Sequence, residues 1–281
     1  MAEYLQSPNL NSDLISLPEH LDNPDFLNAP DHLTVQDLSI GYGQRVVMRD
    51  LNFAIKRGDI FVIMGASGCG KSTLLKVLIG LNAPMQGRVL FHNSTLGTVD
   101  FWHATVAERQ YIMRHAGTTF QGGALWSSMT LAENVALPLE QYTTLKPKEI
   151  QDLVSYKLSL VGLAGFEEYY PSEISGGMQK RAGLARALAL DPEIVFFDEP
   201  SAGLDPVSAR LLDDLIVELR QSLGTTFVVV THELASIFHI ATNAIYLDVE
   251  SRTMSSMGRP QDLIRSQSDP NVRHFLTRGD G

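Results

Sequence analysis

The sequence is poor in cysteine, in basic residues and in long apolar runs. Its one cysteine, Cys69, has no partner for an internal disulfide, which fits a reducing compartment. No stretch approaches the roughly 18 consecutive apolar residues of a membrane helix. The first ten residues lack the basic and then apolar pattern of a secretory signal. We therefore expect a protein that is soluble, or attached to a membrane only through a partner.

Acidic residues outnumber basic ones by 32 to 22, which gives a formal net charge of -10. A protein that binds nucleic acid along the phosphate backbone needs an excess of Lys and Arg. We therefore expect no nucleic acid among the partners, although a small local basic patch is not excluded. Residues 1–32 contain no Lys or Arg and four prolines. This composition predicts an acidic, flexible N-terminal extension with a short helix near Leu14–Leu21.

From about Leu33 the pattern changes to short β-rich runs that alternate with helical stretches. Three runs, Ile60–Met64, Ile194–Phe197 and Thr226–Val230, are continuously apolar rather than alternating. Such strands are typical of a parallel sheet covered by helices on both faces. The sequence predicts an α/β domain over residues 33–258 with a β-rich N-terminal part.

The helical segments fall into three groups. Residues 121–190 lack strong strand signals and are predicted to form an inserted helical subdomain. A second helix should run from a cap at Asp205 to Gly224, with Pro206 in its first turn. Its buried stripe is predicted to be Leu212, Leu215, Ile216, Leu219 and Leu223. Residues 259–281 form a C-terminal tail, with one or two surface helices expected in Gln261–Leu276.

The most specific motif is a phosphate-binding loop. The nine residues are Gly65, Ala66, Ser67, Gly68, Cys69, Gly70, Lys71, Ser72 and Thr73, and they fit G-x4-G-K-[ST]. The motif follows a predicted strand and precedes an apolar helix expected over Leu74–Leu81. Glycines let the backbone curl so that N–H groups face an anion at the helix N-terminus. Lys71 is expected to reach the β- and γ-phosphates of ATP, and the Ser72 hydroxyl to bind Mg²⁺.

Cys69 lies in the middle of this loop and has no expected role in hydrolysis. An anion-binding loop favours a thiolate, so we expect this thiol to be reactive. The hypothesis predicts that a thiol reagent inactivates the protein and that ATP protects it.

Polar residues follow three predicted strands. Asp198 and Glu199 end the strand Ile194–Phe197, where an Asp of a phosphate-loop enzyme holds Mg²⁺ and a Glu can activate water. Acidic pairs at strand ends are more often helix caps. The phosphate-binding loop upstream favours the catalytic interpretation of this pair. His232 follows the next strand, where α/β sheets bind ligands, although a lone His is usually structural. Gln121 follows another probable strand.

Residues Glu173–Arg181, reading EISGGMQKR, resemble the signature sequence of ABC ATPases. The resemblance covers about residues 33–258 and includes the family's motifs in order. It implies a P-loop NTPase core, a stacking contact of Tyr42 with adenine, and binding of Mg²⁺ and water by Gln121. It also implies that His232 senses the γ-phosphate and that the loop ending at Asp205 communicates across a dimer.

The signature opens a helix, so its free N–H groups form a second anion site. Two such helix ends in one chain suggest two chains that share each nucleotide. The resemblance implies that Ser175, Gly176 and Gly177 act on the ATP held by the opposing subunit of a homodimer. The departures from the family pattern are Ile174, Met178 and Glu233, and none removes a catalytic group.

Finer features resemble the ATPases of bacterial mammalian-cell-entry (MCE) lipid transporters. They are residues 120–126 (FQGGALW), 131–139 (LAENVALPL), 175–181 (SGGMQKR) and 269–276 (DPNVRHFL). The resemblance implies peripheral attachment to the cytoplasmic face of the inner membrane through an integral membrane permease, with a periplasmic MCE-domain protein as a further partner. It also favours a groove for a permease helix at the Trp-bearing stretch Ala124–Met129. The alternative is an importer of a small polar solute.

Two other classes of ATPase fit less well. A DNA-repair or chromosome-organising ATPase would carry long coiled-coil heptads between the phosphate loop and the signature, and these are absent. A ribosome-acting factor would usually hold two ATP sites and a basic linker, whereas this chain has one site and an acidic balance.

Overall fold

The computed structural model of the chain describes residues 29–265 and 269–277. The helix predicted near Leu14–Leu21 lies outside the described residues. The chain enters its first strand at Asp31, and His32 is already buried.

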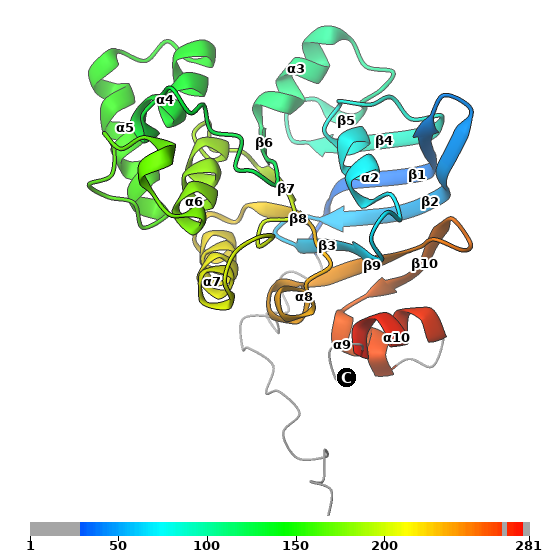
Figure 1. Cartoon of the computed structure of the whole chain (residues 1–281). Coiled ribbons are helices and arrows are strands. Elements are labelled where there is room, and N and C mark those ends of the chain that lie inside the picture. The colour runs from blue at the N-terminus through cyan, green and yellow to red at the C-terminus, as the bar shows by residue number, and fades with distance from the viewer. Residues whose placement is uncertain (1–28, 266–268, 278–281) are drawn as a thin grey trace, which may run out of the picture.

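Two sheets form the centre of the molecule (Figure 1). A four-stranded antiparallel sheet has the order β2-β1-β4-β5, and a six-stranded sheet has the order β10-β9-β3-β8-β7-β6. The strands of the small sheet are β1 (Asp31–Tyr42), β2 (Arg45–Lys56), β4 (Gln86–Asn93) and β5 (Gly97–Asp100). Those of the large sheet are β3 (Ile60–Gly65), β6 (Ala116–Thr119), β7 (Ile194–Asp198), β8 (Thr226–Val230), β9 (Asn243–Asp248) and β10 (Thr253–Gly258).

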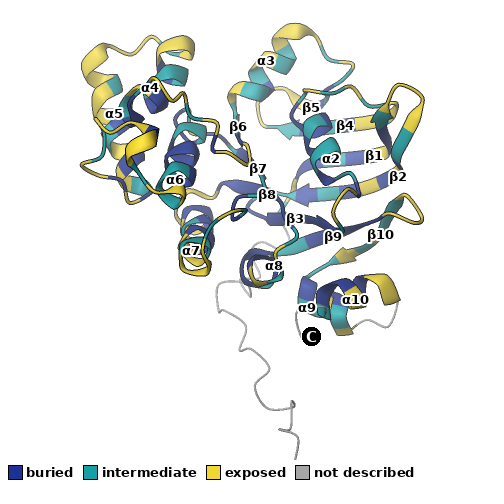
Figure 2. Ribbon diagram, in the orientation of Figure 1, coloured by how far each residue is buried: buried dark blue, intermediate teal, exposed yellow. Residues whose placement is uncertain are grey.

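The large sheet is parallel except for β10, which pairs antiparallel with β9. Its central strands are buried on both faces, as the continuous apolar runs predicted (Figure 2). Ile60, Val62 and Met64 point into one hydrophobic cluster, while Phe61 and Ile63 point into the other. This alternation follows from the two-residue period of a strand. The mainly parallel α/β fold and the β-rich N-terminal part are confirmed.

The helices divide between the two faces of the large sheet. Their bounds are α2 (Lys71–Leu78), α3 (Val106–Arg114), α4 (Leu131–Tyr142), α5 (Pro147–Leu160), η2 (Pro171–Glu173), α6 (Gly176–Ala187), α7 (Pro206–Leu223), α8 (Leu234–Ile240), α9 (Pro260–Arg265) and α10 (Pro270–Thr277). Helix α2 contributes to the cluster shared with the small sheet, and α4 to α10 contribute to the opposite cluster. In Figure 1, α4, α5 and α6 form a lobe beside the sheets. The region 121–190 is therefore helical, as predicted.

Helix α2 differs from the predicted range Leu74–Leu81. It begins at Lys71, directly after Gly70, whose φ of 104° ends the preceding loop. It ends at Leu78 because the chain turns at Gly80, which has a φ of 80°. The apolar run extends beyond the last residue of the helix. The left-handed glycine, rather than the end of the apolar run, therefore ends the helix.

Helix α7 has the predicted caps at both ends. The Asp205 carboxylate accepts hydrogen bonds from the backbone N–H of Val207 and Ser208, both at 3.0 Å. Gly224 closes the helix in the left-handed conformation, with a φ of 68°. The predicted stripe is buried or partly buried except at Leu223, which is 40% exposed. The prediction for Leu223 was wrong: this last residue of α7, directly before the Gly224 cap, is exposed.

The C-terminal segment forms two helices, as predicted. The apolar side chains of α10, Val272, Phe275 and Leu276, are buried against the chain's own core. The ring of Phe275 lies 5.3 Å from that of Tyr246 on β9. None of the described helices combines the length and the hydropathy that crossing a bilayer requires.

The interface of α7 and α8 buries an ionisable group. Asp213 is 3% exposed, and one of its carboxylate oxygens has no hydrogen-bond partner among the described residues. Burial raises the pKa of Asp213 to about 6, against the opposing effects of a Ser236 hydrogen bond and of the charges on His239 and Arg210. The folded state therefore favours the protonated carboxyl.

We predict that Asp213 makes the free energy of unfolding fall as the pH rises from about 4 to about 6. Over that window the folded protein keeps a proton that the unfolded chain has released. Asp213→Asn cannot titrate, so its stability relative to the wild type should increase with pH by up to about 3 kcal/mol. Urea unfolding of both proteins at several pH values measures this difference. A difference that stays constant, as we expect for the exposed control Asp152→Asn, contradicts the assignment.

Candidate nucleotide-binding site

A cavity of about 480 Å³ lies at the carboxyl ends of the large sheet's strands. Its lining residues come from the hairpin of the small sheet, from the β3–α2 loop and from the loops after β6, β7 and β8. They are Tyr42, Arg45, Val47, Ser67, Gly68, Gly70, Lys71, Ser72, Thr73, Gln121, Glu199 and His232. Residues far apart in the sequence thus meet where an α/β sheet usually binds its ligand.

The β3–α2 loop curls because of its glycines. Gly68 and Gly70 have φ values of 78° and 104°, which side chains with a Cβ rarely adopt. A Cβ on Gly70 would also lie 2.7 Å from a methyl group of Val47. Lys71 is buried and its ammonium donates to the carbonyls of Gly65 at 3.0 Å and Ala66 at 3.1 Å. The lysine therefore lies inside the loop, as a phosphate ligand requires.

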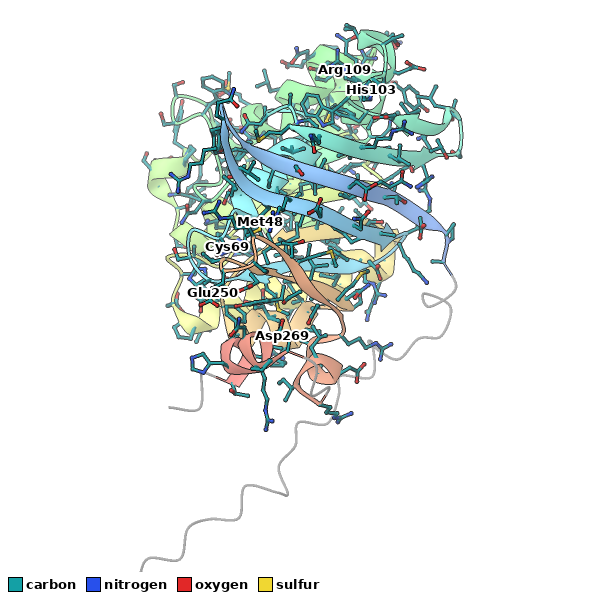
Figure 3. All side chains as sticks on the ribbon, turned by 90° about the vertical axis from the view of Figure 1, so that its right-hand side faces the viewer. Met48, Cys69, His103, Arg109, Glu250 and Asp269 are labelled. Atoms are coloured by element: carbon teal, nitrogen blue, oxygen red, sulfur yellow. The ribbon has the colours of Figure 1, made fainter. Side chains whose placement is uncertain are left out.

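Cys69 points away from this cavity. Its side chain is 2% exposed and belongs to the cluster that also contains Met48 (Figure 3). Burial raises the pKa of the Cys69 thiol, and the positive charge of Lys71 only partly opposes this. The expectation of a reactive thiolate was wrong, because the loop directs its backbone rather than this side chain toward the anion. Gly65 and Ala66 are likewise absent from the cavity wall and contribute carbonyls to Lys71.

Ser72 lines the cavity, and Asp198, which is not part of the cavity wall, contacts Ser72. The Ser72 hydroxyl donates to Asp198 Oδ1 at 3.1 Å. A hydroxyl and a carboxylate are the hard oxygen ligands that Mg²⁺ prefers, usually together with waters and substrate phosphates. The pair therefore fits a magnesium ion beside a bound nucleotide. Among the described residues there is no cluster of three or more His, Cys, Asp or Glu side chains that could hold a metal alone.

Glu199 and His232 both line the cavity and are hydrogen-bonded to each other. Nδ1 of His232 donates to the Glu199 carboxylate, at 2.9 Å from Oε1 and 3.0 Å from Oε2. The backbone of Glu199 has a φ of 50°, which is unusual for a residue other than glycine. Its N–H donates to the carbonyl of Val230 on β8, which fixes this turn. Such backbone strain is found preferentially at functional sites.

Tyr42 and Arg45 belong to the β1–β2 hairpin and reach the cavity from the small sheet. Tyr42 is 53% exposed, and its hydroxyl lies 3.4 Å from Thr73 Oγ1 and within 3.5 Å of the Asn82 amide. A half-exposed ring of this kind can stack on a base. Sequence reasoning missed Arg45. No motif marks it, and only its pairing opposite Tyr42 in the hairpin brings it to the cavity.

Ser175, Gly176 and Gly177 do not line this cavity. The Ser175 hydroxyl caps α6 by accepting from the N–H of Met178 at 3.2 Å. The two glycines form the first turn of α6, where backbone N–H groups have no partner within the helix. The chain therefore has two helix starts with free backbone N–H groups, of α2 and of α6, and only the first lines the cavity. Asp205, expected to act in the same communication, caps α7.

The chain belongs to the ABC transporter family. The family model described as ABC transporter matches residues 48–202, which include the phosphate loop, the signature and the Asp198-Glu199 pair.

The relatives agree with this assignment. The chain is 39% identical over 243 residues to the intermembrane phospholipid transport system ATP-binding protein MlaF of Escherichia coli, covering 86% of this chain and 87% of MlaF. It is 38% identical over 244 residues to MlaF of Haemophilus influenzae, covering 87% and 89%. It is 39% identical over 244 residues to the probable ribonucleotide transport ATP-binding protein mkl of Mycobacterium tuberculosis. That match covers 87% of this chain but only 66% of mkl, just under two thirds of its length.

Solved structures of ATP-binding cassettes share the fold. A dimeric post-hydrolysis state of the cassette MJ0796, bound to ADP and phosphate, superposes with a TM-score of 0.69 at 29% identity and covers 81% of this chain and 98% of its own. The cassette cbiO1 of Clostridium perfringens superposes with a TM-score of 0.74 at 25% identity, covering 88% and 95%.

Proposed function

We propose that this chain is the ATP-hydrolysing subunit of a lipid-transporting ABC system and works as a homodimer. The observation that carries the proposal is the separation of two anion-binding helix ends in one subunit. The start of α2 faces the cavity, whereas the start of α6 lies outside it. A head-to-tail pair of subunits brings each α6 to the partner's cavity, so that each nucleotide lies between two chains. The dimeric state of the cassette MJ0796 supports this arrangement.

The cavity supplies the groups that ATP hydrolysis needs. The β3–α2 loop and Lys71 bind the phosphates, and Tyr42 stacks on adenine. Glu199 orients and deprotonates the attacking water, while His232 holds the Glu199 carboxylate and contacts the γ-phosphate. Gln121 lies on the cavity wall beside them and completes the contacts to the γ-phosphate and water.

Ser72, Asp198 and Gln121 are the residues that would hold Mg²⁺ in this site. When bound, the ion neutralises charge on the phosphates. The protein's own part is to keep Ser72 and Asp198 within hydrogen-bond distance of each other.

A membrane permease is the proposed partner of the helical lobe. Trp126 is 59% exposed and lines a hollow together with Arg114, Pro138, Tyr142 and residues of α6. Asn134 fixes this stretch, because its amide accepts from the N–H of Trp126 at 2.8 Å and donates to the carbonyls of nearby residues. The loop therefore presents the indole from a fixed backbone, which suits a docking contact.

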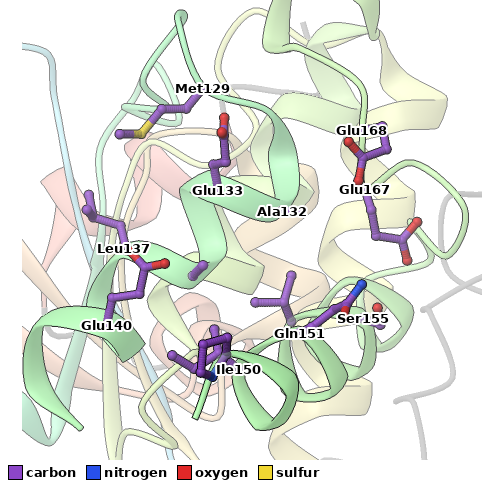
Figure 4. Close-up of a pocket in the computed structure, with 13 residues that line it drawn as sticks. Met129, Ala132, Glu133, Leu137, Glu140, Ile150, Gln151, Ser155, Glu167 and Glu168 are labelled. Carbon is purple, nitrogen blue, oxygen red and sulfur yellow. The ribbon is translucent and has the colours of Figure 1, made fainter. Parts of the chain in front are cut away.

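A second hollow lies next to it, between α4 and α5 (Figure 4). Its floor is apolar, with Ala132, Leu137 and Ile150. Four carboxylates surround it: Glu133, Glu140, Glu167 and Glu168. An apolar floor with an acidic rim is complementary to an amphipathic helix that carries Lys or Arg. Both hollows belong to the groove in which we place the permease's cytoplasmic helix.

The cargo is proposed to be membrane phospholipid, moved through the permease with a periplasmic MCE-domain protein, at the cytoplasmic face of the bacterial inner membrane. The similarity to MlaF of two organisms, over 86–89% of each chain, supports this cargo. The second candidate is a small polar solute. The name of mkl, a probable ribonucleotide transport protein, favours that class, but the chain covers less of mkl than of MlaF.

We predict that Glu199→Gln binds ATP but hydrolyses it slower by on the order of 10² to 10⁴, because the amide cannot take a proton from water. Lys71→Ala should instead weaken ATP binding and catalysis together. Equilibrium binding of a fluorescent ATP analogue and phosphate release measure the two effects separately. The exposed Glu218→Gln on α7 serves as the matched control. Near-normal turnover of Glu199→Gln refutes its role, and unchanged ATP affinity of Lys71→Ala refutes that of the lysine.

We predict that the Glu199→Gln variant, purified gently in detergent with ATP from its native host, brings down a permease, an MCE-domain protein and enriched phospholipid. Mass spectrometry identifies the proteins and lipids. The double variant with Trp126→Ser should lose the permease if the groove is the docking site. A permease with a solute-binding protein and no lipid enrichment overturns the cargo. Nucleic acid or ribosomes without any membrane protein overturn the transporter assignment.

A further inference from the structure

The loop that carries Gln121 is attached to α6, the helix that the signature opens. Backbone carbonyls of the loop accept hydrogen bonds from side chains of this helix. The Lys180 ammonium donates to the carbonyl of Gln121 itself. The Arg186 guanidinium donates to the carbonyl of Ala124 at 2.8 Å and to that of Gly123 at 3.3 Å. Three of the four carbonyls between residues 121 and 124 thus bind cationic side chains of α6.

The backbones of the loop and the helix also approach closely. A Cβ on Gly183 of α6 would lie 2.9 Å from the carbonyl oxygen of Gly123 and 3.3 Å from its Cα. Real Cβ atoms essentially never come within 3.0 Å of another heavy atom, so a side chain at Gly183 would force the loop or the helix to shift. Gly183 stands three residues after Lys180 and three before Arg186, so all three lie along the side of α6 that faces the loop.

The conformation of the loop depends on these contacts. Gly123 and Ala124 are both left-handed, with φ values of 74° and 52°. This conformation costs an alanine of order 1 kcal/mol or more, and it persists only when the surroundings fix it. Because Arg186 binds the carbonyls of these same two residues, α6 supplies that fixation.

Lys180 also belongs electrostatically to the nucleotide site. It is 7% exposed, and its ammonium lies in the field of the negative charges of Glu199 and Asp198. A buried ammonium needs partners that compensate its lost hydration. Here those partners are the Gln121 carbonyl and the field of the two carboxylates.

We infer that Lys180, supported by Arg186 and Gly183, is a positioning residue that makes Gln121 and the signature helix move as one body. The inference rests on the proposed role of Gln121 at the nucleotide and deepens it. A shift of Gln121 toward the γ-phosphate carries α6 with it. The start of α6 is the group that binds the partner subunit's nucleotide, so occupancy of one site is transmitted to the other. Lys180 touches neither substrate and acts only through the Gln121 backbone.

The test compares steady-state ATP hydrolysis of four purified full-length variants. Lys180→Met keeps the length of the side chain but removes its charge and donors, and should lower kcat by roughly tenfold to a hundredfold with little change in KM for ATP. Lys180→Arg keeps the charge and donors and should restore most of the turnover. Gly183→Ala removes no donor and suits a helix better, yet its methyl group pushes the loop away, so it should also lower kcat. Lys148→Met on the exposed face of α5 is the matched control and should behave as the wild type.

A double-mutant cycle separates positioning from a merely structural effect. Because Lys180 acts through Gln121, Lys180→Met should add little to the loss caused by Gln121→Ala. Losses that multiply fully, or wild-type turnover in both Lys180→Met and Gly183→Ala, overturn the inference. If Gln121→Ala itself keeps wild-type turnover, the proposed role of Gln121 fails. If Gln121→Ala is slow while Lys180→Met and Gly183→Ala are normal, only the attachment to α6 fails.

Discussion

The turn between β3 and α2 has to bring several backbone N–H groups and one ammonium to the same point, and the rest of the structure is arranged around that requirement. The turn needs left-handed backbone at Gly68 and Gly70, and it needs Lys71 at the first position of α2. Helix α2 must then be buried between the two sheets, which is why its apolar residues belong to the cluster shared with the small sheet. The small sheet in turn brings Tyr42 and Arg45 over the loop.

The second constraint is that the starts of α2 and α6 do not share one cavity. Asp198 ends β7, and Glu199 and His232 follow the neighbouring parallel strands β7 and β8, so the sheet itself places them beside the loop. The signature is at the start of α6, and this helix packs against the backbone of the loop that carries Gln121. Under the proposed function, a second copy of the chain completes the site. In the same proposal, the presence of a γ-phosphate governs the opening and closing of that interface.

Much of this was predictable from the sequence for specific physical reasons. The strands Ile60–Gly65 and Thr226–Val230 are continuously apolar because both of their faces are buried, and α7 is marked by Asp205 and Gly224 at its ends. Other features depend on tertiary packing that no local pattern encodes. The Cys69 side chain is buried, Leu223 is exposed, and the carbonyl that accepts from Lys180 belongs to Gln121, 59 residues away along the chain. The burial of the Asp213 carboxyl could not be predicted either, because its position on α7 gives no sign that α8 covers it.

The claim that each nucleotide is shared between two chains is tested most directly by mixing two inactive variants. Lys71→Ala disables the phosphate loop, and Ser175→Glu places a negative charge at the start of α6, so each homodimer should be inactive. A mixed dimer contains one site with an intact loop and an intact signature. The account predicts that mixing equal amounts restores ATP hydrolysis to about a quarter of the wild-type rate, since half of the dimers hold one intact site of two. No recovery, in a mixture shown to exchange subunits, would contradict the shared site and with it the proposed dimer.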